Sequence, residues 1–451
     1  MHVSVARLSY SDAKHLALNG DWHRMLRGTF SEFGFCYELE DIPLAPLLVH
    51  SSDLRLIESK LRRLMALSRS LAMSEFDRRS PVRQDHRAIV ELYRDADRAP
   101  IMGRPDCIVS GGVLKVIELN IESGMGGIQE VHELAVGYNS SPLGEIIDVH
   151  LTSPLDAQIQ FISTMLDSVA SKSVAVVPLA DFSRLYLDQS DRLATEIKNR
   201  LGVLAKTVFP EALRQGEWLT DGQNDYGIFF RDACYLHEPI ALQGMEQALR
   251  NARHTNTIVL SDPVDIGVDD KGALALVSEV LDGPLRHHPE FSDLRPIIPW
   301  TRLLDRKETT VNGSNVDLAK YVREHRHKLV LKKCASHVGK QVYMGSQTDP
   351  AIWEDIVKRT KAASKDGDDW IVQEYLPSDK HPFWFLSPGG QPVLRPAGGT
   401  LGPFLYGDTM PGWLVRVQGQ YTFDEAVLAL PTDGNIGITT IGGIEPGKHS
   451  G

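Results

Sequence analysis

Four polar residues, in two pairs spaced two apart, lie where two short strands are predicted. Arg104 and Asp106 open the segment "RPDCIVSG", and Glu118 and Asn120 lie in "LKVIELNI", with a Ser-Gly-Gly turn between the two segments. Residues two apart on a strand project to the same face, so a hairpin would bring these side chains together. Two carboxylates and an amide oxygen suit Mg²⁺ bound together with phosphates, and a guanidinium suits phosphate itself. A solvated surface ion pair is the alternative explanation.

Lysines at two other places could hold phosphate. Lys271 opens the apolar-periodic segment "KGALALVSEVL" directly after Asp269 and Asp270. The aspartates suit a helix N-terminus, but a lysine there is disfavoured unless it faces an anion. In "LVLKKCASHVGKQV" a predicted strand delivers Lys332, and a loop returns through Gly339. This loop lacks the second glycine and the Ser or Thr of a Walker-type phosphate loop, so two solvated lysines at a strand end remain an alternative.

Two later segments carry further candidate side chains. "WIVQEYL" is a predicted strand whose Gln373 and Glu374 could meet a purine or ribose hydroxyls, and "PGWLVRVQ" places Arg416 on a strand after a Pro-Gly turn. An ordinary strand and a solvated arginine are the alternatives. Arg231, in "YGIFFRD", could reach a substrate, although a structural ion pair also explains it. No H-E-x-x-H, G-x-S-x-G or G-x-G-x-x-G motif occurs in a suitable context.

Composition restricts the classes of function. The chain has 451 residues, a formal net charge of -11, 42% hydrophobic and 24% charged residues. An acidic protein without a basic run is not expected to bind nucleic acid, and no apolar window is long enough to span a membrane. The four cysteines form no C-x-x-C pair, and the N-terminal segment does not resemble a signal peptide. A cytoplasmic location is therefore expected.

Hydrophobic periodicity predicts several kinds of element along the chain. Residues 52–75 repeat apolar residues at helical spacing, and the region up to about residue 98 is predicted to be mostly helical. Strands and helices alternate between about 150 and 265, which is typical of an α/β domain. Residues 377–415 and 431–447 are rich in glycine and proline and are predicted to be loops.

Taken together and in order, these segments resemble the circularly permuted ATP-grasp proteins, which include glutathionylspermidine synthase-type carboxylate–amine ligases. The resemblance extends from about residue 100 to about 420. The E-x-N metal strand, which comes last in an ordinary ATP-grasp chain, comes first here, as a permutation would produce. The sequence departs from the family in having Lys332-Lys333 for Lys-Pro, so which lysine points inward is open. It also has a single glycine in the phosphate loop and no amidase domain.

The resemblance implies roles for individual residues. Asp106, Glu118 and Asn120 would hold Mg²⁺, and Arg104 and Arg416 would stabilise the transferred phosphoryl group. The residues that it nominates for ATP are Lys271, Lys332, Gly339, Gln373, Glu374, Tyr375 and Leu376.

The resemblance also implies a mixed α/β and α+β architecture, an ATP-grasp fold with a preceding α/β domain and a helical N-terminal region. The expected parts are a helical region (1–98), a metal-binding hairpin (99–150), an α/β domain (151–265), a nucleotide-binding lobe (266–376) and the remainder of the ATP-grasp core (377–451). The implied activity is ATP-dependent joining of a small-molecule carboxylate to an amine through an acyl phosphate, giving ADP and phosphate. A small-molecule kinase and a non-catalytic nucleotide-binding protein are the alternatives, and a homodimer is a family-level expectation.

Overall fold

The computed structural model describes most of the chain. The residues outside the description are 1–2, 7, 23, 27–41, 76–83, 97–98, 122–124, 142–148, 179–183, 233–238, 312, 335–340, 364–368, 388, 419–435 and 446–451. Within the described residues, every helix is too short or too polar to cross a membrane.

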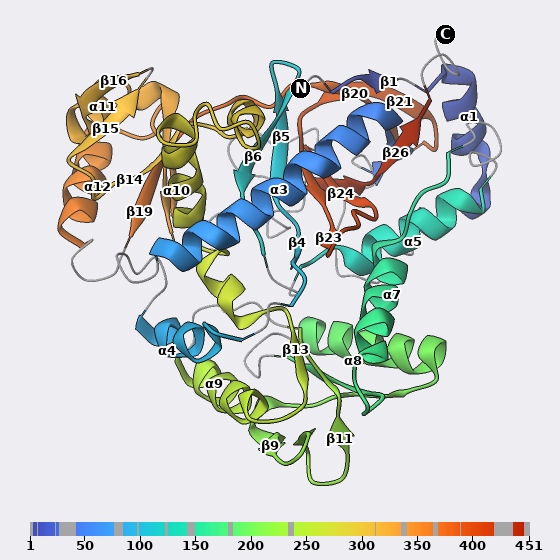
Figure 1. The fold of residues 1–451 in the computed structure, drawn as a ribbon. Coiled ribbons are helices and arrows are strands. Elements are labelled where there is room, and N and C mark those ends of the chain that lie inside the picture. Colours follow the sequence, from blue (N-terminus) through green and yellow to red (C-terminus); the bar gives the residue numbers. More distant parts are fainter. Residues whose placement is uncertain are drawn as a thin grey trace.

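A five-stranded antiparallel sheet forms the centre of the larger part of the molecule (Figure 1). Its strands, in order across the sheet, are β25 (Ile436–Thr439), β24 (Trp413–Gln418), β22 (Gly399–Pro403), β5 (Asp106–Ser110) and β6 (Val113–Glu118). Strands β5 and β6 form the predicted hairpin, which turns at Gly111 and Gly112 with φ values of 59° and 73°. Two positive φ values match a two-residue type I′ turn. Asp106 is thereby placed opposite Glu118.

The prediction of loops in the glycine- and proline-rich segments is wrong for most of their described residues. They contain β22 and β24 as well as β20 (His381–Leu386), β21 (Pro392–Ala397), β23 (Leu405–Tyr406), β25 and β26 (Ile441–Ile444). Glycine serves here for close approach: a Cβ at Gly402 would lie 2.9 Å from Cδ of Arg104. The prolines of β21 are tolerated because β21 is the edge strand in the order β2-β20-β21, with β2 at Ile42–Pro43.

A second antiparallel sheet belongs to the lobe at the left of Figure 1. Its order is β14 (Thr301–Leu303), β19 (Trp370–Glu374), β17 (Leu329–Lys333) and β18 (Val342–Met344). Helices α11 (Leu318–Glu324) and α12 (Pro350–Ala363) pack through Leu318 and Trp353 on the face that bears Val372. Helix α10 (Lys271–Asp282) packs through Leu276 on the opposite face, beside Ile371. The hairpin β15 (Glu308–Val311) and β16 (Ser314–Asp317) adjoins this sheet.

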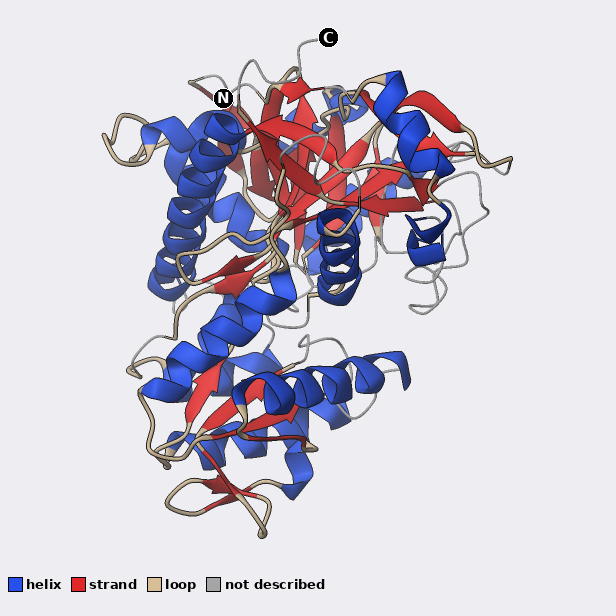
Figure 2. Cartoon of the chain, turned by 90° about the vertical axis from the view of Figure 1, so that its right-hand side faces the viewer, coloured by secondary structure: helices blue, strands red, loops and turns tan. Residues whose placement is uncertain are grey.

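A parallel sheet is present where alternating strands and helices predicted an α/β domain. Its order is β13 (Ile258–Leu260), β12 (Ile228–Arg231), β7 (Ser173–Val177) and β8 (Leu204–Thr207). Helices α7 (Pro154–Asp167) and α8 (Arg184–Leu201) cover one face, and α9 (Pro239–Arg253) and α4 (Gln84–Tyr93) cover the other. A small sheet of β9 (Arg214–Gln215), β10 (Leu219–Thr220) and β11 (Asp225–Tyr226) lies at the far end of this part (Figures 1 and 2).

The N-terminal part contains strands as well as the predicted helices α1 (Tyr10–Leu18) and α3 (Ser51–Glu75). Strand β3 (Leu47–His50) pairs with β1 (Val5–Ala6) on one side and runs parallel to β26 on the other. Strand β2 pairs with β20, and β4 (Met102–Gly103) pairs with β23. These strands are too short to show the alternation of apolar and polar residues that identifies a strand in a sequence. They are recognised only by their pairing with other strands in the structure.

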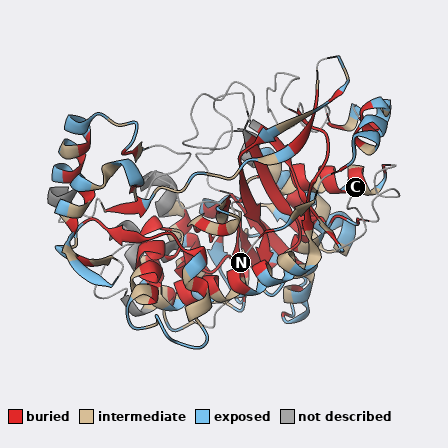
Figure 3. Ribbon diagram, turned by 90° about the horizontal axis from the view of Figure 1, so that it is seen from above, coloured by how far each residue is buried: buried red, intermediate tan, exposed pale blue. Residues whose placement is uncertain are grey.

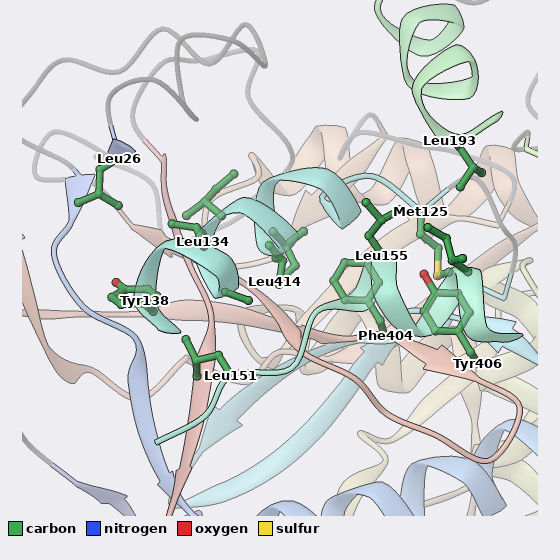
Figure 4. Packing of buried hydrophobic residues seen from close by; sticks show 14 of the residues in the cluster. Leu26, Met125, Leu134, Tyr138, Leu151, Leu155, Leu193, Phe404, Tyr406 and Leu414 are labelled. Carbon is green, nitrogen blue, oxygen red and sulfur yellow. The ribbon is translucent and has the colours of Figure 1, made fainter. Parts of the chain in front are cut away.

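The strands of the central sheet other than β6 are buried through most of their length (Figure 3). One large hydrophobic cluster joins this sheet to α5 (Ile128–Asn139) and α7. Figure 4 shows part of it, with Leu134 and Tyr138 from α5, Leu414 from β24 and Leu155 from α7. The cluster fixes α5 against the sheet, which matters for the site described below.

We expect Gly103→Ala to destabilise the protein by about 1–3 kcal/mol, because overpacking beside fixed backbone forces a shift. The added Cβ would lie 2.6 Å from the backbone oxygen of Asn120 and 2.7 Å from Cε of Met65. Urea unfolding measures the change. Gly20→Ala is the matched control, since nothing lies within 4 Å of its added carbon. Equal stability of the two variants would contradict the close packing at Gly103.

Candidate active site

An arginine–carboxylate centre lies on one face of the central sheet. Asp106 Oδ2 is 2.6 Å from Nη2 of Arg416 on β24, and Asp106 Oδ1 is 3.6 Å from Nη2 of Arg104. Both arginines are buried, with 4–6% of their surface exposed. Burial by itself would raise the pKa of Asp106, but Arg416 and Arg104 outweigh it and hold this pKa below its ordinary value. The carboxylate is therefore charged at neutral pH.

A lysine at the start of a helix is disfavoured unless it faces an anion, and Lys271 at the start of α10 faces the carboxylate of Glu118. Its Nζ lies 2.9 Å from Glu118 Oε1, and its side chain is 6% exposed. Burial lowers the pKa of Lys271, but Glu118 overcomes that effect and the net shift is upward. Asp270 caps α10 by accepting a hydrogen bond from the Gly272 backbone N–H at 2.6 Å. The cap fixes where the helix begins and thus where Lys271 stands.

Lys332 points between the two antiparallel sheets. Its Nζ donates to Gln373 Oε1 at 2.7 Å and to the Ile117 backbone oxygen at 3.3 Å. Ile117 is the neighbour of Glu118 on β6, so this lysine spans from one sheet to the other. Lys332 is 9% exposed, whereas the adjacent Lys333 is half-buried. Alternation along β17 therefore sends Lys332 and not Lys333 toward the central sheet.

If Lys332 holds ATP phosphate, as the resemblance to the ATP-grasp proteins implies, ATP affinity should fall as the pH rises above about 8, by up to about tenfold per pH unit. The pKa of Lys332 is lowered to about 8, because burial and the neighbouring Lys271 lower it more than Glu118 and Asp106 raise it. The unfolded lysine titrates near 10.5, so between these values the unfolded state binds more protons. Between these two values, Lys332 therefore makes the folding stability rise with pH. Over the same range its side chain loses the positive charge that would attract phosphate.

ATP titrations between about pH 7 and about pH 9.5 measure this dependence. Lys332→Arg is the control, because its guanidinium stays charged across the range. A pH dependence that is equal in the wild type and this variant would assign the effect to another group.

Asn120 lies directly beside the arginine centre. Its Nδ2 donates to the Arg104 backbone oxygen at 3.0 Å, and its own backbone oxygen accepts from the Arg104 N–H at 2.7 Å. Two facing carboxylates and a neighbouring amide are a donor set that suits Mg²⁺ shared with phosphate oxygens. Both carboxylates are held by cations, and the described residues contain no group of three or more His, Cys, Asp or Glu suited to a metal. The described residues therefore do not form a complete metal site on their own, and a metal here would need phosphate oxygens as further ligands.

The other predicted residues are less closely gathered. Gln373 on β19 lies on the same face of the sheet as Lys332 on β17, and it donates to Thr301 Oγ1 at 3.1 Å. The side chain of Glu374 instead lines a separate pocket of about 440 Å³ together with Trp300, Tyr321 and Lys328. Tyr375 and Leu376 follow β19, and their side chains are half-buried. Gly339 lies outside the described residues.

Arg231 is fully buried in the parallel sheet. Its Nη2 donates to Ser261 Oγ at 2.8 Å, and its Nε donates to the Ser261 backbone oxygen at 3.3 Å. Ser261 adopts a positive φ of 60°, which is unusual for a residue other than glycine. Arg231 thus braces a loop at the carboxyl edge of the sheet.

Two acidic residues that the sequence did not single out for the site have a place in it. Asp269 accepts the Ile121 backbone N–H at 3.0 Å and so ties the segment after β6 to the start of α10. Glu130, in the first turn of α5, is 3% exposed. Acidic residues at helix starts are explained by capping and the helix dipole, so their types and positions gave no functional signal.

The fold resembles a solved structure of a ligase-like protein. No protein-family model matches the sequence, and no curated protein sequence matches it significantly. A glutathione synthetase-like effector from Globodera pallida aligns with a TM-score of 0.55 at 15% identity, over 91% of this chain and 90% of its own. A protein assigned as a gamma-glutamylcysteine synthetase from Methylobacillus flagellatus aligns with a TM-score of 0.42 at 12% identity, over 81% and 84%. This chain therefore has a mixed α/β fold like that of the glutathione synthetase-like effector.

Proposed function

We propose that this protein is an ATP-dependent ligase that joins a carboxylate to an amine through an acyl phosphate. One observation supports it most: Arg104, Asp106, Glu118, Lys271 and Arg416, which are spread over the chain, gather on one face of the central sheet, with Lys332 reaching toward them. The set combines groups for phosphate with groups for a metal. The likeness of the fold to a glutathione synthetase-like protein agrees with this reading. We also propose that the fold is a circularly permuted ATP-grasp fold.

In the proposed reaction, the residues act mainly by position and charge. Lys332 and Lys271 would hold ATP phosphates, and Gln373 with the backbone after β19 would hold the adenosine. Arg104 and Arg416 would neutralise the carboxylate and the transferred phosphoryl group as these anions meet. Asp106, Glu118 and Asn120 would hold Mg²⁺, which when bound neutralises phosphate charge. The phosphoryl group passes to the carboxylate, and the amine then displaces phosphate to form the amide.

The test is ADP and phosphate release by the purified protein with Mg-ATP and a pooled library of amino acids, polyamines and small peptides. Turnover that requires both an acid and an amine is expected. Phosphorylation that proceeds without an amine would favour a small-molecule kinase. ATP binding without turnover in any mixture would favour a non-catalytic nucleotide-binding protein.

A further inference from the structure

Thr301, the first residue of β14, is fully buried and contacts the side chain that holds Lys332. Its Oγ1 donates to the Pro299 backbone oxygen at 3.0 Å. A hydroxyl has one proton, so once this bond is made Thr301 Oγ1 can only accept from other groups. The Gln373 amide nitrogen donates to it at 3.1 Å. Because the Pro299 carbonyl can only accept, it fixes the direction of the hydrogen bond between Thr301 and Gln373.

The direction of this bond decides which end of the Gln373 amide meets Lys332. With the amide nitrogen bonded to Thr301, Oε1 of Gln373 accepts from Lys332 Nζ at 2.7 Å. The nitrogen also donates to the Ile117 backbone oxygen at 3.4 Å. A reversed amide would turn its N–H donors toward the Lys332 ammonium and its oxygen toward the Ile117 carbonyl. The network therefore has one orientation in which donors and acceptors match.

A fixed acceptor matters because Lys332 is buried, and burial disfavours the charged form of a lysine. Its ammonium has three N–H donors, and the acceptors that the described residues offer it are Gln373 Oε1 and the Ile117 backbone oxygen. These two acceptors hold the ammonium in the space between the two sheets and leave one donor for a phosphate oxygen. Without the oriented Gln373 oxygen, Lys332 would keep only the longer bond, of 3.3 Å, to Ile117.

The protein holds Thr301 in place through its backbone, without any nucleotide. The Thr301 N–H donates to Ser278 Oγ at 3.0 Å, and Thr301 lies opposite Gln373 in the pairing of β14 with β19. Ser278 belongs to α10, the helix that begins at Lys271 and lies beside β14 in Figure 1. One helix thus carries Lys271 and braces the residue that orients Gln373.

We propose that Thr301 is a positioning residue for nucleotide binding: it orients the Gln373 amide, and the amide oxygen then keeps the Lys332 ammonium directed at the phosphates of ATP. This inference rests on the ligase function proposed above. Thr301 itself contacts neither the phosphates nor the metal in this arrangement. Its effect therefore passes through Gln373 to Lys332.

Calorimetric titration with Mg-ATP tests this chain of contacts. Thr301→Val keeps the size of the side chain and removes the hydroxyl, and we expect it to weaken ATP binding roughly tenfold. Thr301→Ser keeps the hydroxyl and should bind ATP within about threefold of the wild type. In a Gln373→Ala background, Thr301→Val should cause no further loss, because the amide through which it acts is absent.

Thr439→Val is the matched control for the loss of a buried hydroxyl. Thr439 on β25 is also fully buried, and its Oγ1 donates to the Ala45 backbone oxygen at 3.0 Å. It is not part of the network around Lys332, so Thr439→Val should bind ATP within about twofold of the wild type.

Urea unfolding at two pH values gives a readout that needs no nucleotide. The Gln373 oxygen stabilises the charged form of Lys332, and the charged groups that act on this lysine, Glu118, Asp106 and Lys271, are unchanged in the variants. The drop in urea midpoint caused by Thr301→Val should therefore be larger at about pH 7 than at about pH 9.5, where Lys332 is mostly neutral. Thr439→Val should lower the midpoint equally at both.

The inference would be overturned if Thr301→Val bound ATP like the wild type, or if its loss persisted in the Gln373→Ala background. An equal loss in Thr301→Ser, or a drop in urea midpoint that is the same at both pH values, would show a packing role and would also overturn it. Failure of the ligase function is a different result: the wild type would bind ATP and show the Thr301 effects but join no acid to an amine. A wild type that bound no ATP would remove both proposals.

Discussion

Lys332→Ala is expected to weaken ATP binding by roughly 10- to 100-fold, the value of a charge-assisted hydrogen bond to phosphate. The reason is its direction: Nζ of Lys332 crosses from β17 to the Ile117 backbone oxygen beside Glu118. Fluorescence or calorimetric titration with ATP measures the loss. Because Lys332 also holds Gln373, part of the loss would come through the adenosine contact.

Lys333→Ala is the internal control for this experiment. It removes the same charge one residue away, from a side chain that alternation directs to the other face of the strand. We expect ATP binding within about twofold of the wild type. A larger loss in Lys333→Ala than in Lys332→Ala would reverse the assignment and give the nucleotide a different path through the lobe.

Glu118→Gln is expected to lower Mg-dependent turnover at least about 100-fold, because a metal that neutralises transferred phosphate contributes several kcal/mol. The same change releases Lys271, whose ammonium lies 2.9 Å from Glu118. ATP binding without magnesium should therefore be unchanged or tighter. Turnover and metal-free binding are measured on the same preparation, by ADP release and by calorimetry.

The exposed Glu217, in the α/β domain, provides a matched substitution. Glu217→Gln removes a carboxylate charge far from the centre and should leave both readouts unaltered. If Glu118→Gln kept wild-type turnover, Glu118 would hold no metal. If Glu118→Gln also lost ATP binding in the absence of magnesium, the ion pair of Glu118 with Lys271 would be required for nucleotide binding and would not compete with it.

Local patterns predicted much of the fold around the site. The hairpin at Gly111 and Gly112, the helix that opens at Lys271 and the strand that carries Arg416 are set by turn chemistry, capping and periodicity, and the structure has all three. Strands β2 and β3 were not predicted, because two to four residues carry no periodicity and the strands β20 and β26, with which they pair, lie more than 340 residues further on.

The candidate site shows the same division. The pairing of Asp106 with Glu118 could be predicted from spacing, since both belong to one hairpin. The ion pair of Glu118 with Lys271 and the hydrogen bond of Lys332 to the Ile117 backbone oxygen could not, because each depends on how separate elements pack. Alternation predicts that the neighbours Gln373 and Glu374 point to opposite faces of β19, but not which of them faces Lys332: in the structure Gln373 contacts Lys332 and Glu374 lines a different pocket.

The parallel pairing of β3 with β26 bears on how the protein is made in the cell. The central sheet and the sheet of β1, β3 and β26 combine strands from residues 47–50, 106–118, 399–418 and 436–444. A ribosome must therefore synthesise the chain through residue 444 before these sheets can close, and until then β3 lacks its partner β26 and β5 lacks its partner β22. The nascent protein should consequently need protection by chaperones, and the arginine–carboxylate centre, which includes Arg416 on β24, should assemble last.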